Sequence, residues 1–163
     1  MKRKTLYLCH AAIIAALYVA LTYLSAMFGL SSSAIQCRFS EALCVLPYFT
    51  SAAVPGVTVG CLVANLITGT AVWADIVFGT LATLIGALGT LLLRKIKWLA
   101  PIPPIVSNTL IIPFVLKYAY NLEDGVGFLM LTVGVGEVIS AGVLGILLLL
   151  ALEPYQKRLF KNK

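Results

Sequence analysis

Long runs without a charged residue constrain this chain more than any other feature, and the clearest are Leu81–Leu93 and Val138–Leu152. Hydrophobic residues make up 61% of the 163 residues and charged residues only 11%, and the mean hydropathy is +1.01. An average soluble domain carries roughly 25% charged residues, so the composition excludes an ordinary cytosolic enzyme, a disordered chain and a disulfide-stapled secreted domain. Because transmembrane β-strands alternate apolar and polar residues, the unbroken runs predict an integral membrane protein built of helices.

The apolar runs predict one all-α integral membrane domain over residues 1–163 with six transmembrane helices. The first helix follows the basic cluster Lys2-Arg3-Lys4, and its length favours a retained span over a signal peptide. A serine-rich linker, Gly29–Cys37, comes next. The six helices are expected at about 6–28, 38–49, 55–69, 76–93, 104–120 and 126–152.

The stretch from Arg38 to Gly69 is open to two interpretations: one long span broken by Pro47 and Pro55, or two short ones. The distribution of basic residues discriminates between them, because cytoplasmic loops collect Lys and Arg. Six helices with the N-terminus inside leave ten of the twelve basic residues on the inner side, with Arg38 and Lys117 outside. Five helices keep only four of them inside. We therefore expect six helices with both termini in the cytoplasm.

Acidic residues are the first candidates for a binding site. Glu137 lies within the sixth predicted helix, and a carboxylate inside a span is costly and marks a functional site by default. The alternative is that it pairs with a neighbouring helix for structure alone. Glu41 follows Arg38 by three residues, so the two share a helical face. They form either a local ion pair or a pair that lines an outward-facing pocket. Asp75 is expected near the outer end of a helix.

Two asparagines and a tryptophan are further candidates. Asn65 and Asn108 lie within predicted spans, where an amide either forms an interhelical hydrogen bond or matches the donor–acceptor edge of a nucleobase. Trp73 lies at the outer end of the third helix or in the loop after it. It is either an aromatic-belt residue or a stacking platform for a flat ligand.

Small residues recur every four positions on the first helix, at Ala12, Ala16 and Ala20. Such spacing lets another helix approach closely, whether that helix is internal or belongs to a partner.

The sequence offers no catalytic motif. It contains no phosphate-binding GxxxxGK[ST] loop, no HExxH and no GxSxG, and His10 is its single histidine. The four cysteines form no CxxC pair. We therefore expect no enzyme activity, no ATP hydrolysis, no cofactor and no metal site in this chain.

At this point several motifs resemble those of one family. The run Arg38-Phe39-Ser40-Glu41-Ala42-Leu43, followed by Leu46-Pro47, is similar to the RxSEAL…LP signature of the QueT family. Val54-Pro55-Gly56 with Gly60–Leu66, then Asp75–Thr83, and then Gly136-Glu137 extend the resemblance over nearly the whole chain.

QueT proteins are S components of energy-coupling factor (ECF) transporters. The resemblance implies a substrate-binding subunit of an ATP-driven importer in the bacterial plasma membrane, which takes up a queuosine precursor, a 7-deazaguanine base. It also implies partnership with a membrane T component, docked at the alanines of the first helix, and with two cytoplasmic ATPase subunits that use ATP.

The candidate substrate-binding residues fit such a base chemically. Carboxylates accept its N–H donors, a second carboxylate pairs with the aminomethyl ammonium that some precursors carry, amides read the adjacent edge, and an aromatic ring covers its face. Arg38 then orients Glu41. The candidates are Glu137, Glu41, Asp75, Asn65, Asn108, Trp73 and Arg38.

The residues alone are compatible with other functions. The chain could be an S component for another small vitamin-like molecule. It could also be a small intramembrane enzyme with Glu41, Asp75 and Glu137 around a metal, or a structural subunit whose acids pair internally.

Overall fold

The computed structural model of the protein describes residues 3–29, 37–68 and 72–160, and within these ranges the chain is helical and has no strand. The all-α prediction is therefore confirmed for this part of the chain. Residues 30–36 of the serine-rich linker, Gly69 at the expected end of the third helix, and the terminal basic residues Lys2, Lys161 and Lys163 lie outside it.

The helices follow one another with short connections; η1, η3 and η5 are 3₁₀-helices and η2 and η4 are π-helices. The elements are α1 (Arg3–Met27), η1 (Phe39–Tyr48), α2 (Ala53–Thr68), η2 (Asp75–Gly79), α3 (Thr80–Leu92), η3 (Lys97–Leu99), α4 (Ile102–Tyr118), α5 (Val126–Glu137), η4 (Val138–Leu144), α6 (Gly145–Leu152), η5 (Glu153–Tyr155) and α7 (Gln156–Leu159).

Four helical segments in the described ranges have the length and apolar composition that crossing a membrane requires. They are Lys4–Met27, Asp75–Leu92, Lys97–Tyr118 and Val126–Leu159. α2 is also apolar but shorter. Their exposed surfaces are covered with large apolar side chains, as expected where lipid is the solvent.

The stretch after Arg38 forms two helices, η1 and α2, rather than one long helix. η1 is the innermost element: Ser40–Pro47 are all buried, and it packs against α1, α3, η4 and α6. A helix surrounded in this way is expected to be apolar on all sides. Glu41 breaks that pattern, so a carboxylate is carried into the middle of the protein.

Glycines on α2 let α1 pack closely against it. A Cβ atom at Gly60 would lie 2.6 Å from Tyr18 Cβ, and one at Gly56 would lie 2.9 Å from Ile14 Cβ. The close approach seats Tyr18 in the core, where it is fully buried.

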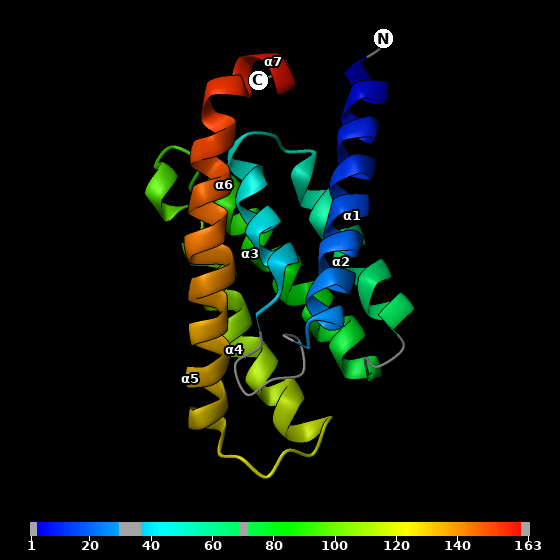
Figure 1. Ribbon diagram of the computed structural model, residues 1–163, viewed down its shortest axis with the longest axis vertical. Coiled ribbons are helices and arrows are strands. Elements are labelled where there is room, and N and C mark those ends of the chain that lie inside the picture. The colour runs from blue at the N-terminus through cyan, green and yellow to red at the C-terminus, as the bar shows by residue number, and fades with distance from the viewer. Residues whose placement is uncertain (1–2, 30–36, 69–71, 161–163) are drawn as a thin grey trace.

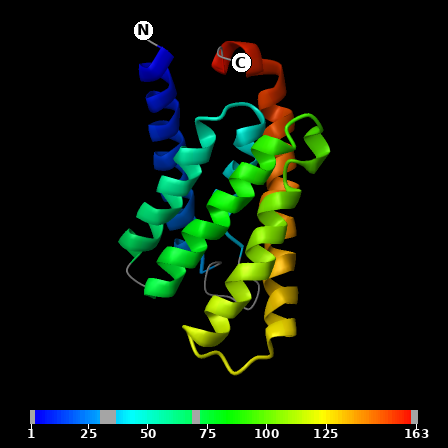
Figure 2. The same cartoon turned by 180° about the vertical axis from the view of Figure 1, so that it is seen from behind.

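The two termini lie at one end of the molecule, and the turn between α4 and α5 lies at the other (Figures 1 and 2). The long segment that begins with α5 runs the full length of the protein between these ends (Figure 1). At the end that carries the termini, Lys97 Nζ forms an ion pair with Glu153 Oε2 at 3.1 Å, which links η3 to η5.

Candidate binding site

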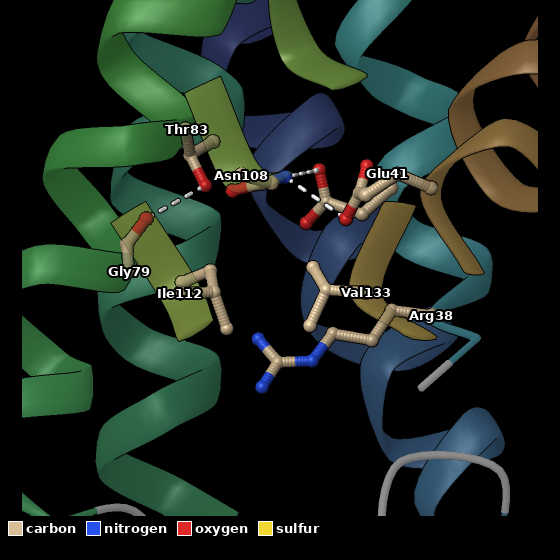
Figure 3. A pocket seen from close by; sticks show the side chains of 8 residues that line it. Arg38, Glu41, Gly79, Thr83, Asn108, Ile112 and Val133 are labelled. Atoms are coloured by element: carbon tan, nitrogen blue, oxygen red, sulfur yellow. Dashed lines mark hydrogen bonds between the residues drawn. The ribbon is translucent and has the colours of Figure 1, made fainter. Parts of the chain in front are cut away.

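A small polar cavity lies between the helices in the middle of the protein (Figure 3). Its volume is about 10 Å³, which is room for roughly one water molecule. Five elements and the residue before η1 contribute to its wall. The lining residues are Arg38, Glu41, Gly79, Thr83, Asn108, Ile112, Val133 and Glu137.

The amide of Asn108 joins two carboxylates from different helices. Its Nδ2 atom donates to Glu137 Oε1 at 3.0 Å and to Glu41 Oε2 at 3.3 Å (Figure 3). An amide NH₂ group has two donors. Both are used here, so Asn108 ties α4 to η1 and to α5 at the cavity.

Glu137 has one carboxylate oxygen without a partner. Its side chain is buried, with 8% of the residue exposed, and Oε2 has no hydrogen-bond partner within the described residues. A buried acceptor left in this way costs free energy comparable to a lost hydrogen bond, so such atoms are rare in folded proteins. Because Glu137 also lines the cavity, Oε2 is the acceptor available to a ligand there.

Glu41, by contrast, is held by three donors. Tyr18 donates its hydroxyl to Oε1, the Cys44 thiol lies 3.3 Å from Oε2, and Asn108 donates to that same oxygen. Thr22 adds a hydrogen bond to Ser40, one residue earlier. α1 thus fixes the position of η1 and of its carboxylate.

Arg38 pairs with Asp75 rather than with Glu41. Arg38 Nη2 lies 3.7 Å from Asp75 Oδ2, and the Tyr120 hydroxyl donates to the same oxygen at 3.2 Å. Arg38 lines the cavity together with Glu41, whereas Asp75 is not one of the lining residues. Arg38 and Glu41 both line the cavity, but the ion pair that Arg38 forms is with Asp75, so the structure does not show the Arg38–Glu41 pair that both interpretations assumed.

Asn65 and Trp73 are not among the residues that line the cavity. Asn65 donates to the main-chain carbonyl of Asp75 at 3.3 Å, so it braces the first residue of η2. Trp73 is 70% exposed and lines a separate apolar groove between η2, α3 and α4. Four of the seven candidates therefore meet at one cavity, Asp75 and Asn65 support it, and Trp73 lies apart.

Two π-helices border the cavity. η2 begins at Asp75 and ends at Gly79, and η4 begins directly after Glu137. A π-turn shifts the direction of the side chains that follow it and is frequent at functional sites. No sequence signal in this chain predicts these turns.

Sequence reasoning missed several residues of the site. Tyr18 and Cys44, which hold Glu41, read as ordinary residues of apolar helices. Ile112 and Val133 read as core residues, yet they lie between the carboxylate–amide cluster and the Arg38 guanidinium (Figure 3). A tyrosine on the inner face of α1 was the one available signal, since a buried hydroxyl needs a partner.

Within the described residues, no three His, Cys, Asp or Glu side chains are grouped in a way that could hold a metal ion. The polar groups that line the cavity are two carboxylates, an amide and a guanidinium. Because carboxylates accept hydrogen bonds, this set suits an organic ligand with N–H donors.

Apolar helices around a small cavity lined by carboxylates and an amide define a helical membrane protein with a polar interior. The chain belongs to the QueT transporter family, whose model matches residues 8–154.

A stretch of 97 residues is 38% identical to the queuosine precursor transporter QueT of Lactococcus lactis subsp. cremoris (strain MG1363). It covers 59% of this chain and 56% of that relative, so the match spans little more than half the length of the relative. No solved structure matches the chain significantly.

Proposed function

We propose that this protein is the substrate-binding S component of an ECF-type importer and that it takes a queuosine precursor, a 7-deazaguanine base, from outside the cell. In this proposal η1 and α2 complete a six-helix membrane bundle with the four long segments. Both termini lie in the cytoplasm of a bacterial cell. Membership of the QueT transporter family and the name of the Lactococcus relative support the substrate class.

The observation that carries the proposal is the unpartnered Oε2 atom of Glu137, a residue that lines a small cavity together with Glu41, Asn108 and Arg38. A guanine-like ring presents N–H donors along one edge, and a carboxylate oxygen is the strongest acceptor a protein can offer to them. Asn108, whose two N–H donors are used by the carboxylates, keeps its amide oxygen for a ligand, and the side chains of Ile112 and Val133 supply apolar surface for a flat ring.

The ligand cannot enter the cavity as it stands, because 10 Å³ is far smaller than a bicyclic base. Ile112 and Val133 lie between the carboxylate–amide cluster and Arg38, so these side chains have to separate during binding (Figure 3). They come from α4 and α5, which pack against each other along their length. Binding therefore requires a change in the packing of α4 on α5.

In this proposal the ATPase activity belongs to partner subunits, since this chain contains no phosphate-binding loop. Ala12, Ala16 and Ala20 are all exposed on α1, on the side opposite the α2 contact made by Ile14 and Tyr18. We propose that this stripe contacts a membrane T component, which couples the chain to two cytoplasmic ATPase subunits. Small residues there permit close helix packing in lipid.

A thermal-shift experiment tests the binding function. The purified chain in detergent is heated with guanine, with 7-deazaguanine bases and with unrelated vitamins. A ligand at 100 times its dissociation constant adds about 2.7 kcal/mol of stability, so a 7-deazaguanine should raise the melting temperature. Stabilisation by an unrelated vitamin alone would contradict the substrate assignment. Absence of stabilisation by every compound would favour a structural subunit.

A further inference from the structure

Positive charge gathers at the end of the molecule that carries the termini, and acidic residues of the chain do not balance it. Four basic side chains are exposed there, and none of them forms an ion pair with a described residue. They are Arg94, Lys95, Lys157 and Arg158, which we call the basic end. Glu153 is the carboxylate nearby, and it is already paired with Lys97. The counter-charge for the basic end therefore has to come from outside the chain.

The last helical turn, α7, lies across this end instead of continuing along the bundle (Figure 1). The ring of Phe160, the next residue, stacks on Phe49 with 5.3 Å between the centroids, and it meets the His10 ring edge-on at 5.9 Å. Phe160 thereby packs against the hydrophobic core. This contact fastens α7 to the protein, while the two basic side chains of α7 stay exposed.

The connection between α3 and α4 is held beside the start of this turn. Lys97 Nζ lies 3.1 Å and 3.3 Å from the two carboxylate oxygens of Glu153, and 5.4 Å from the centre of the Trp98 ring. Arg94 and Lys95 precede Lys97 on the same connection. The ion pair thus places both halves of the basic end on one surface.

Large apolar side chains are exposed between these cations. Ile96 and Trp98 are 53% and 59% exposed on the connection, and Tyr155 and Leu159 are 57% and 46% exposed in η5 and α7. An acidic protein surface would match the cations and leave these side chains against polar groups. The boundary between lipid headgroups and acyl chains offers negative charge and apolar volume together, and aromatic and long basic side chains are favoured at that depth.

We propose that the basic end binds anionic phospholipids. Their phosphate groups pair with the four cations, and the exposed apolar side chains enter the layer beneath the headgroups. At the opposite end, Lys117 donates to main-chain oxygens and the turn carries Glu123 and Asp124, so that end is a less favourable surface for anionic lipid. The inference concerns the lipid around the protein and does not depend on which molecule the cavity binds.

The fluorescence of Trp98 tests the proposal. The chain has two tryptophans, so Trp73→Phe leaves Trp98 as the single emitter. This protein is placed in phosphatidylcholine nanodiscs that contain an equal mole fraction of either brominated phosphatidylglycerol or brominated phosphatidylcholine. Bromine quenches tryptophan at short range, so the extent of quenching reports which lipid lies beside Trp98. Phosphatidylglycerol should be preferred by at least roughly fivefold, the enrichment expected of one Lys or Arg near an anionic surface. The preference should shrink at high salt.

A fourfold variant removes the charge and keeps the apolar side chains: Arg94→Gln, Lys95→Gln, Lys157→Gln and Arg158→Gln. It should lose the preference for phosphatidylglycerol, whereas Lys117→Gln, the matched control at the opposite end, should keep it. All four replaced side chains are exposed, so the variant should fold.

Equal quenching by the two lipids would overturn the proposal, as would an undiminished preference in the fourfold variant. The comparison of lipids in the Trp73→Phe protein decides even if the fourfold variant does not fold. Equal quenching together with loss of uptake by the fourfold variant in cells would also overturn it, and would assign the basic end to an acidic protein partner.

Discussion

The guanidinium of Arg38 lies 3.7 Å from the carboxylate of Asp75, so the residue before η1 is paired with the first residue of η2. The two side chains are mostly buried, with 20% and 8% exposed. Removing one partner of a buried pair leaves an uncompensated charge, which costs more than the pair contributes.

A double-mutant cycle on this pair should therefore show strong coupling. Arg38→Gln and Asp75→Asn should each lower the unfolding temperature of the purified protein. The double variant should lose less stability than the sum of the singles, with a coupling of about 0.5–3 kcal/mol. Thermal unfolding in one detergent measures all four proteins. Additive losses would show that the two side chains act independently.

The packing of α1 on α2 should not tolerate a methyl group at Gly60. A Cβ there would lie 3.0 Å from the Ala15 carbonyl oxygen as well as against Tyr18, so α1 has to shift. Gly60→Ala should destabilise the protein by about 1–3 kcal/mol. Gly127→Ala is the matched control, because nothing lies within 4 Å of its Cβ position and alanine favours a helix. A Gly60→Ala protein as stable as the control would contradict the close α1–α2 contact.

The exposed stripe on α1 should matter for uptake and not for binding. Ala16→Trp should abolish uptake in cells, because a bulky ring prevents close approach of the T component, while ligand affinity stays nearly unchanged. Ala15→Trp is the contrasting variant, since Ala15 lies against Gly60 and its replacement should disrupt folding. Titration of purified protein and uptake in cells separate the two effects. A parallel loss of binding in Ala16→Trp would show that the stripe is internal packing.

The six-helix topology predicts opposite sides for two exposed positions. Asp124 lies in the turn between α4 and α5, and Tyr155 lies near the C-terminus. In a background with Cys9 and Cys37 replaced by serine, a membrane-impermeant maleimide should label Asp124→Cys in intact cells. Tyr155→Cys should be labelled only after the membrane is opened. Labelling of both positions in intact cells would contradict the topology.

Much of the helix arrangement was predictable because it depends on local patterns. Uncharged runs predict the long helices, and Pro47 and Pro55 indicate the break between η1 and α2. The buried carboxylates and amides could be found because polar groups are rare in such runs and need partners. Glu41, Asn108 and Glu137 were predicted in this way, and all three line the cavity.

The rest depends on three-dimensional packing that spacing along the chain does not encode. Arg38 lies three residues before Glu41, yet its ion-pair partner is Asp75, the first residue of η2 and far along the chain. Trp73 directly precedes the buried residues Ala74 and Asp75, yet its own side chain is exposed on the protein surface. The π-helices η2 and η4 are likewise not specified by any residue type in their sequences.

Isothermal titration of the wild type and of Glu137→Gln tests the central claim most directly. The ligand is the 7-deazaguanine base that stabilises the wild type most. Glutamine keeps the shape but can turn an N–H toward the N–H of the ligand, which leaves buried donors unpaired. The loss should be about 1–3 kcal/mol, or roughly 10- to 100-fold in affinity. Unchanged affinity in a folded Glu137→Gln protein would contradict the account, because Glu137 would then not contact the ligand.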